Sequence, residues 1–97
     1  MCGAPKQGGA LAGIDLSTQT VIQGQVWHDG APVAGAYVRL LDGTDEFTAE
    51  VVTSPEGEFR FFAAPGAWKV RSLAPVGRGE RGLSAEVGLN ETTIVIE

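Results

Sequence analysis

Apolar and polar residues alternate in short runs from Thr20 to the end of the chain, and turn-forming residues separate the runs. Such alternation is typical of half-buried β-strands, because successive side chains point to opposite faces of a sheet. In one clear run, Phe59 and Phe61 alternate with Glu58 and Arg60. The pattern predicts seven strands, the sixth being the weakest, over residues 20–27, 36–41, 46–53, 58–63, 67–74, 82–87 and 92–96.

Seven short strands with frequent turns predict an all-β domain, and no segment shows the periodicity of a helix. We expect a seven-stranded Greek-key β-sandwich of immunoglobulin-like or transthyretin-like type, with a small closed barrel as the alternative. Gly24 interrupts the first strand, which predicts a bulge or the close approach of another backbone. The residues expected to face the core share an apolar character and a spacing of two: Ile22, Val26, Val38, Leu40, Val51, Phe59, Phe61, Trp68, Val70, Ile94 and Ile96.

Two further aromatic residues can be assigned to a face from the same alternation. Phe47 is in phase with Ala49 and Val51, so it is predicted to face inward with them. Phe62 is out of phase with Phe59 and Phe61, so it is predicted to be exposed.

Residues 1–19 contain four glycines and a proline and have no sustained periodicity. Such a segment buries too little apolar surface to offset its loss of conformational entropy. We therefore expect a flexible N-terminal tail over residues 1–19 and one β-sandwich domain over residues 20–97.

Composition and charge exclude several classes of function. The chain has 97 residues, one cysteine and a net charge of −5, and its Lys and Arg residues are scattered. Nucleic acids and anionic membranes are bound by clustered basic residues, so neither is an expected partner. One cysteine cannot form an internal disulfide, and the N-terminus lacks the apolar stretch of a signal peptide. We expect a cytoplasmic protein.

The sequence offers little for catalysis. The single histidine, His28, precedes the turn residues Asp29 and Gly30 and is expected to be a solvated turn residue. A catalytic triad needs a base and an orienting acid beside its nucleophile, and a zinc site needs several Cys, His or carboxylate ligands. We therefore predict that the chain is not an enzyme and has no catalytic residues, metal site or cofactor.

Four short stretches over residues 20–75 resemble the carboxypeptidase regulatory-like domains, which share the transthyretin-like sandwich. They are IQGQV, DGAPVAGAYVRLLD, GEFRFF and PGAWKV, in the same order as in that family. This resemblance implies the fold and is uninformative about function, because one fold supports many tasks.

A second resemblance covers nearly the whole chain. MCGAPKQG, LLDGTDEFTAEVVTS and FRFFAAPGAWKVR are similar to the small SseC-type proteins of actinobacteria, whose genes lie beside a rhodanese-type thiosulfate sulfurtransferase. The family has no assigned activity, so the resemblance implies sulfur metabolism as the context and leaves the mechanism open. Ordinary regulatory-like domains lack MCGAPKQG.

Cys2 is the only thiol of the chain. Removal of Met1 would place a free amine beside it, and that charge and Lys6 would favour the thiolate. A glycine-rich tether could carry Cys2 into another protein's active site as a sulfur acceptor, with Lys6 and Gln7 as polar contacts. An incidental tail cysteine is the alternative.

Four basic residues, Arg39, Arg60, Lys69 and Arg71, fall on outward positions of predicted strands. They would either form a docking surface for an acidic protein partner, with exposed Phe62 beside it, or pair with Glu50 and Glu58 across the sheet. We predict a non-catalytic accessory protein that docks on a rhodanese-type sulfurtransferase. The alternative is a generic interaction or structural module without thiol chemistry; the oligomeric state is left open.

Overall fold

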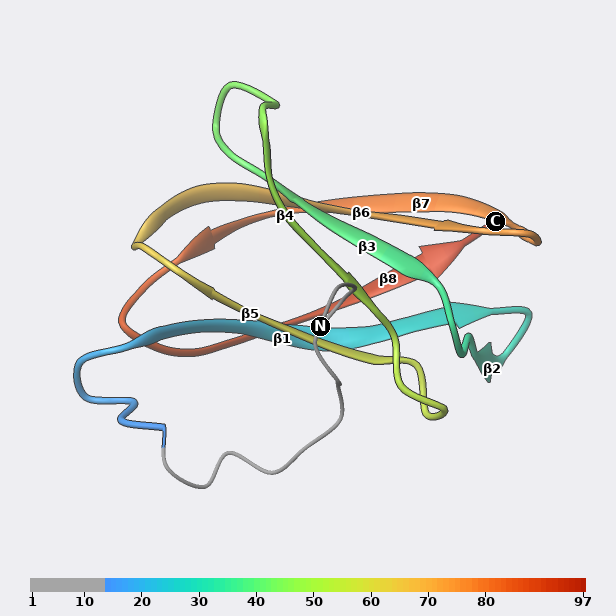
Figure 1. Cartoon of the computed structure of the whole chain (residues 1–97), viewed down its shortest axis with the longest axis horizontal. Coiled ribbons are helices and arrows are strands. Elements are labelled where there is room, and N and C mark those ends of the chain that lie inside the picture. The colour runs from blue at the N-terminus through green and yellow to red at the C-terminus, as the bar shows by residue number, and fades with distance from the viewer. Residues whose placement is uncertain (1–13) are drawn as a thin grey trace, which may run out of the picture.

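The computed structural model describes residues 14–97, which form two β-sheets packed face to face (Figure 1). Side chains that alternate along each strand fill the space between the sheets, so the all-β sandwich prediction is confirmed. The eight strands are β1 (Thr20–His28), β2 (Ala31–Pro32), β3 (Tyr37–Leu41), β4 (Phe47–Val52), β5 (Glu58–Ala63), β6 (Gly66–Ala74), β7 (Gly77–Ala85) and β8 (Gly88–Ile96).

Sheet A is built around β1, which has neighbours on both sides. β5 pairs with it antiparallel over most of its length, and β2 pairs with its last two residues. β8 pairs with β1 in the parallel direction, from Thr20 opposite Gly88 to His28 opposite Ile96. Sheet B is antiparallel throughout, in the order β4-β3-β6-β7.

The core lies between the sheets and contains the side chains that the alternation assigned to it. Ile22, Val38 and Val70 are fully buried, and Phe59 and Phe61 meet with their ring centres 6.0 Å apart. Trp68 is the exception, because it is only partly buried at the margin of the core. Ile94 and Ile96 are buried as predicted.

Gly24 marks a close approach of two backbones, which is one of the two alternatives that its position in the first strand predicted. A Cβ atom at Gly24 would lie 1.7 Å from the carbonyl oxygen of Thr92 in β8, so no larger residue fits there without a shift of the backbone. At the other edge of β8, a Cβ on Gly79 would lie 2.6 Å from the carbonyl oxygen of Val95. Glycine in β7 thus lets the two sheets approach along this side of the sandwich.

The number of strands differs from the prediction of seven. The eighth strand is β2, which has two residues, too few for alternation to be visible in the sequence. β7 was expected over residues 82–87 but begins at Gly77 and forms nine residue pairs with β6. Gly77, Gly79 and Gly82 leave it without an apolar alternation, which is why its first half was missed.

Phe47 does not face inward, and a β-bulge explains why. Leu40 lies opposite Ala49 whereas Leu41 lies opposite Phe47, so Thr48 is an extra residue in β4. An extra residue reverses the facing of everything that precedes it in the strand. Phe47 consequently leaves the phase of Ala49 and is 61% exposed.

The first described residues form a turn that leads into β1. The Asp15 carboxylate accepts hydrogen bonds from the backbone N–H and the hydroxyl of Ser17, and these bonds lower the pKa of Asp15. The N–H of Gln19 bonds back to the carbonyl of Asp15. β1 begins at Thr20, where the first strand was predicted; the earlier part of the predicted tail, residues 1–13, lies outside the described residues. Over residues 14–97 the chain has no helix long and apolar enough to span a membrane.

Candidate protein-binding face

The outer face of sheet B carries three rows of side chains that run across the strands. The central row contains Glu50, Arg39, Arg71 and Glu80, contributed in that order by β4, β3, β6 and β7. One flanking row contains Val52, Tyr37 and Leu73, and the other contains Phe47, Leu41 and Lys69. We call this surface the sheet B face.

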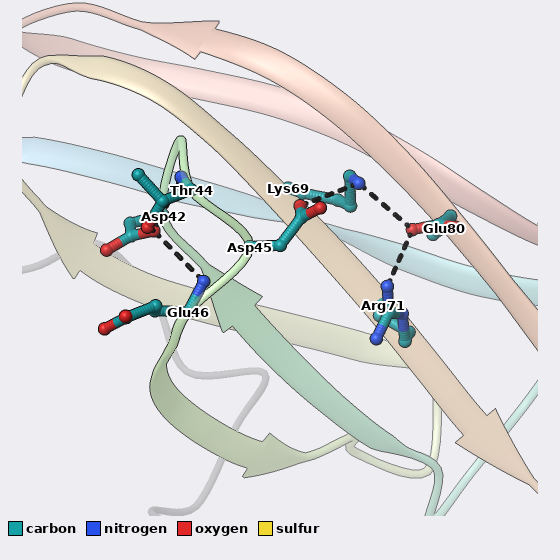
Figure 2. Close-up of polar contacts among 7 residues, drawn as sticks. All are labelled: Asp42, Thr44, Asp45, Glu46, Lys69, Arg71 and Glu80. Carbon is teal, nitrogen blue, oxygen red and sulfur yellow. Dashed lines mark hydrogen bonds and ion pairs between the residues drawn. The ribbon is translucent and has the colours of Figure 1, made fainter.

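Ion pairs organise the central row. Arg39 donates from Nε to Glu50 over 2.8 Å, and Arg71 donates from Nη2 to Glu80 over 3.3 Å. Lys69 Nζ lies 3.7 Å from the same Glu80 oxygen (Figure 2). Pairing of the basic residues with Glu50 and Glu58 was one of the two alternatives from the sequence, and Arg39 does pair with Glu50. Glu80, in the first half of β7, was not anticipated as a partner.

The loop between β3 and β4 is fixed to one end of this face. The Asp42 carboxylate accepts hydrogen bonds from the N–H and the hydroxyl of Thr44 and from the N–H of Glu46. These bonds stabilise the ionised carboxylate and lower the pKa of Asp42. The loop thereby holds Asp45, which has a positive φ of 65°, 2.8 Å from Lys69 (Figure 2). The hydrogen bond to Asp45 and its charge raise the pKa of Lys69.

Exposed aromatic side chains flank the charges. Tyr37 is 53% exposed and Phe47 is 61% exposed, on opposite sides of the central row. Val52 and Leu73 are partly buried beside Tyr37, and Leu41 is buried beside Phe47. Arg and Tyr surrounded by apolar side chains are the residue types enriched at the centres of protein interfaces.

The structure divides the predicted docking residues between two surfaces. Arg39 and Arg71 face each other across the β3–β6 pair on sheet B. Arg60 and Phe62 are on β5, in the outer face of sheet A, where Arg60 Nε donates to Gln23 Oε1 over 3.1 Å. Phe62 is 57% exposed, in agreement with the alternation. The single basic surface that the sequence suggested is therefore two surfaces on opposite sides of the sandwich.

The remaining predicted residues can be placed only in part. Cys2, Lys6 and Gln7 lie outside the described residues. His28 is half-buried at the end of β1, where its Nδ1 lies 3.0 Å from the carbonyl oxygen of Ile96, so it is held by the fold and is not simply a solvated turn residue. Among residues 14–97, no three His, Cys, Asp or Glu side chains are grouped closely enough to hold a metal ion.

Asn90 is a structurally important polar residue that the sequence did not reveal. Its amide nitrogen donates to the carbonyl oxygens of Val21, Glu86 and Gly88, and its amide oxygen accepts from the N–H of Glu86. One side chain thus closes the turn between β7 and β8 and ties it to β1. Asparagine is common in turns, but a contact with β1 depends on strand order and leaves no local signal.

A family model described as "Protein of unknown function (DUF1416)" matches residues 2–96. The chain belongs to the DUF1416 family. Two relatives in Mycobacterium tuberculosis, named "Uncharacterized protein Rv0814c" and "Uncharacterized protein Rv3118", are each 52% identical to this DUF1416 protein over 99 residues. Each alignment covers 99% of both chains. A relative in Mycolicibacterium smegmatis is 62% identical over 69 residues, which is 70% of this chain and 77% of the relative.

The fold of the DUF1416 protein also occurs in a solved structure. A DUF3823 family protein from Parabacteroides merdae superposes on 81% of the chain with a TM-score of 0.66 and 12% sequence identity. The chain spans 46% of the length of that protein. At this identity the likeness concerns the β-fold alone.

Proposed function

We propose that this DUF1416 protein is a non-catalytic protein-binding module that acts as an accessory to a rhodanese-type sulfurtransferase. The observation that carries the binding role is the sheet B face, where exposed Tyr37 and Phe47 flank the paired Arg39 and Arg71. Isolated exposed apolar residues are common on proteins, but aromatic and arginine side chains gathered on one sheet face favour an interface.

The partner and the chemistry come from the sequence. The N-terminal MCGAPKQG and the other stretches that resemble SseC-type proteins suggest a sulfurtransferase as the partner and Cys2 as the sulfur acceptor. A free thiol persists in a reducing compartment, so we place this activity in the cytoplasm.

The proposed transfer is a thiol–persulfide exchange. The sulfurtransferase holds the sulfur taken from thiosulfate as a persulfide on its own cysteine. The Cys2 thiolate attacks the outer sulfur of that persulfide, a new S–S bond forms on Cys2, and the bond to the enzyme's cysteine breaks. The enzyme's cysteine leaves with the electron pair and takes up the proton that Cys2 lost, so no external oxidant or reductant is consumed.

A binding experiment tests the partner. The full chain and a variant that lacks residues 2–10 are each titrated into a rhodanese-type sulfurtransferase from the same organism, and complex formation is followed by calorimetry. We expect the full chain to bind and the truncated variant to bind more weakly or not at all. Equal binding by both would remove the N-terminal segment from the proposal, and no binding by the full chain would overturn the sulfurtransferase assignment.

A generic interaction module without thiol chemistry is the second candidate, and the sheet B face favours it equally. The Cys2→Ser variant separates the two. A module that only docks keeps its function when Cys2 becomes serine, whereas a sulfur acceptor loses it.

A further inference from the structure

The central row of the sheet B face has a symmetric arrangement of charges. Arg39 lies directly opposite Arg71, and each has a glutamate on its outer side, so the order across the sheet is negative, positive, positive, negative. Like charges directly opposite each other destabilise a sheet. Here Glu50 and Glu80 offset that repulsion from the two sides.

This arrangement disfavours a second copy of the chain as the occupant. If two sheet B faces met completely about a two-fold axis, arginine would lie over arginine and glutamate over glutamate. Such like-charge contacts cost binding free energy at an interface. A partner that places an acidic group over the two central arginines would match the charges of this row.

The two arginines have donors left for such a group. Arg39 uses Nε for Glu50, and Arg71 uses Nη2 for Glu80. A guanidinium carries five N–H donors, and within residues 14–97 no other hydrogen bond joins these two side chains to the protein. Because Arg39 and Arg71 are neighbours across the strands, one carboxylate placed between them could accept hydrogen bonds from both.

The flanking rows define what should lie on either side of that carboxylate. Tyr37, Arg39 and Leu41 are alternate residues of β3, so the three rows are about 6.6–6.8 Å apart. Alternate side chains of an extended segment have the same spacing. A segment with the order apolar, any residue, acidic, any residue, apolar would place its carboxylate over the arginines and its apolar side chains over Tyr37 and Phe47.

We propose that the sheet B face binds an extended protein segment in which an Asp or Glu lies between two apolar residues at positions i, i+2 and i+4. The inference rests on the proposed binding role of the domain, but not on Cys2 or on the identity of the partner. It assigns Arg39 and Arg71 to the carboxylate and Tyr37 and Phe47 to the apolar side chains.

A titration with synthetic peptides tests this inference. The probe is a short capped peptide containing Leu-Thr-Glu-Thr-Leu, and the matched probe has Gln in place of Glu. Each is added to the full-length ¹⁵N-labelled chain, and amide shifts are followed by NMR. We expect saturable shifts in β3, β4 and β6 with the Glu peptide and roughly tenfold weaker binding of the Gln peptide, because a charge-assisted hydrogen bond is lost.

Matched variants locate the site. Arg39→Gln combined with Arg71→Gln should bind the Glu peptide roughly tenfold more weakly and should no longer distinguish it from the Gln peptide. Tyr37→Ser should weaken the binding of both peptides. Arg60→Gln and Phe62→Ser, on the opposite sheet, serve as controls and should leave both affinities unchanged. Amide spectra of each variant establish that it is folded.

Four results would overturn the inference: equal affinity for the two peptides, no saturable shift with either, shifts confined to sheet A, or the same shifts produced by sodium sulfate alone. The last would identify a simple anion site. These failures are distinguishable from failure of the proposed function. If the sulfurtransferase binds the natural chain and the arginine double variant equally well, and neither peptide binds the natural chain, this inference fails and the accessory role stands.

Discussion

Gly24 of β1 lies against the backbone of Thr92 in the parallel strand β8, and there is no room for a side chain at this position. A Cβ atom there would lie 1.7 Å from the Thr92 carbonyl oxygen. Gly24→Ala should therefore push β8 away from β1 and cost at least about 1–3 kcal/mol of unfolding free energy, the usual cost of overpacking. Denaturant unfolding followed by tryptophan fluorescence measures this loss.

Gly82→Ala is the matched control, since Gly82 is also within a strand. Its added Cβ would have the Trp68 carbonyl oxygen at 3.9 Å as its nearest neighbour, which is an ordinary contact. We expect a change within about 0.5 kcal/mol. Equal loss of stability in the two variants would show that the cause is not the contact between β1 and β8.

Phe61 and Phe62 provide a second comparison, between adjacent residues of β5 that face opposite sides. Phe61 is 3% exposed in the core and Phe62 is 57% exposed. Phe61→Ala should cost about 3–5 kcal/mol, and Phe62→Ala should change the unfolding free energy by less than about 0.5 kcal/mol. A Phe61→Ala variant that melts within a few degrees of the natural protein would show that the facing of β5 is wrong.

Alternation in the sequence was enough to predict the facing of β5, because its two aromatic core residues, Phe59 and Phe61, alternate with the charged residues Glu58 and Arg60. It failed at Phe47, because the extra residue Thr48 reverses the facing and has no signature in the sequence. It also missed the first half of β7, where Gly77 and Gly79 lie against β8 and offer no apolar side chain to the pattern. The local alternation of apolar and polar residues predicts a strand and the facing of its side chains. It does not predict where a bulge inserts an extra residue or which strands become neighbours.

Only part of the candidate site could be predicted from the sequence. Arg39, Arg60 and Arg71 were each assigned correctly to an outward position. Their grouping was not, because it depends on which strands are neighbours: β3 pairs with β6, whereas β5 is in the other sheet. Glu80 completes the charge row from a stretch of β7 that the sequence did not predict to be a strand.

A substitution at Ser72, in the core, is expected to stabilise the folded protein or leave its stability unchanged. Its hydroxyl is fully buried and has no hydrogen-bond partner within the described part of the chain. A buried hydroxyl without a partner costs about 1–3 kcal/mol, so Ser72→Ala should leave the protein equally stable or stabilise it by about 1 kcal/mol. Thermal unfolding measures this, and a clear loss of stability would show that the hydroxyl has a partner in solution.

Asp42 predicts part of the dependence of stability on pH. Its pKa is lowered in the folded state by the hydrogen bonds from Thr44 and Glu46. A lowered pKa stabilises the fold above the pKa of the unfolded aspartate, and this contribution is lost as pH falls from about 4 through the folded value. Asp42→Asn should thus flatten the acid limb of the unfolding free energy measured against pH, and an unchanged limb would contradict the assigned hydrogen bonds.

The proposal that Cys2 accepts sulfur is tested most directly by intact-mass spectrometry. The full chain is incubated with thiosulfate and a catalytic amount of a rhodanese-type sulfurtransferase, with Cys2→Ser as the matched control. We expect a gain of one sulfur atom on the N-terminal peptide of the natural protein, removed by a thiol reductant, and no gain in Cys2→Ser. An unchanged mass of the natural protein, while the sulfurtransferase itself carries sulfur, would contradict it.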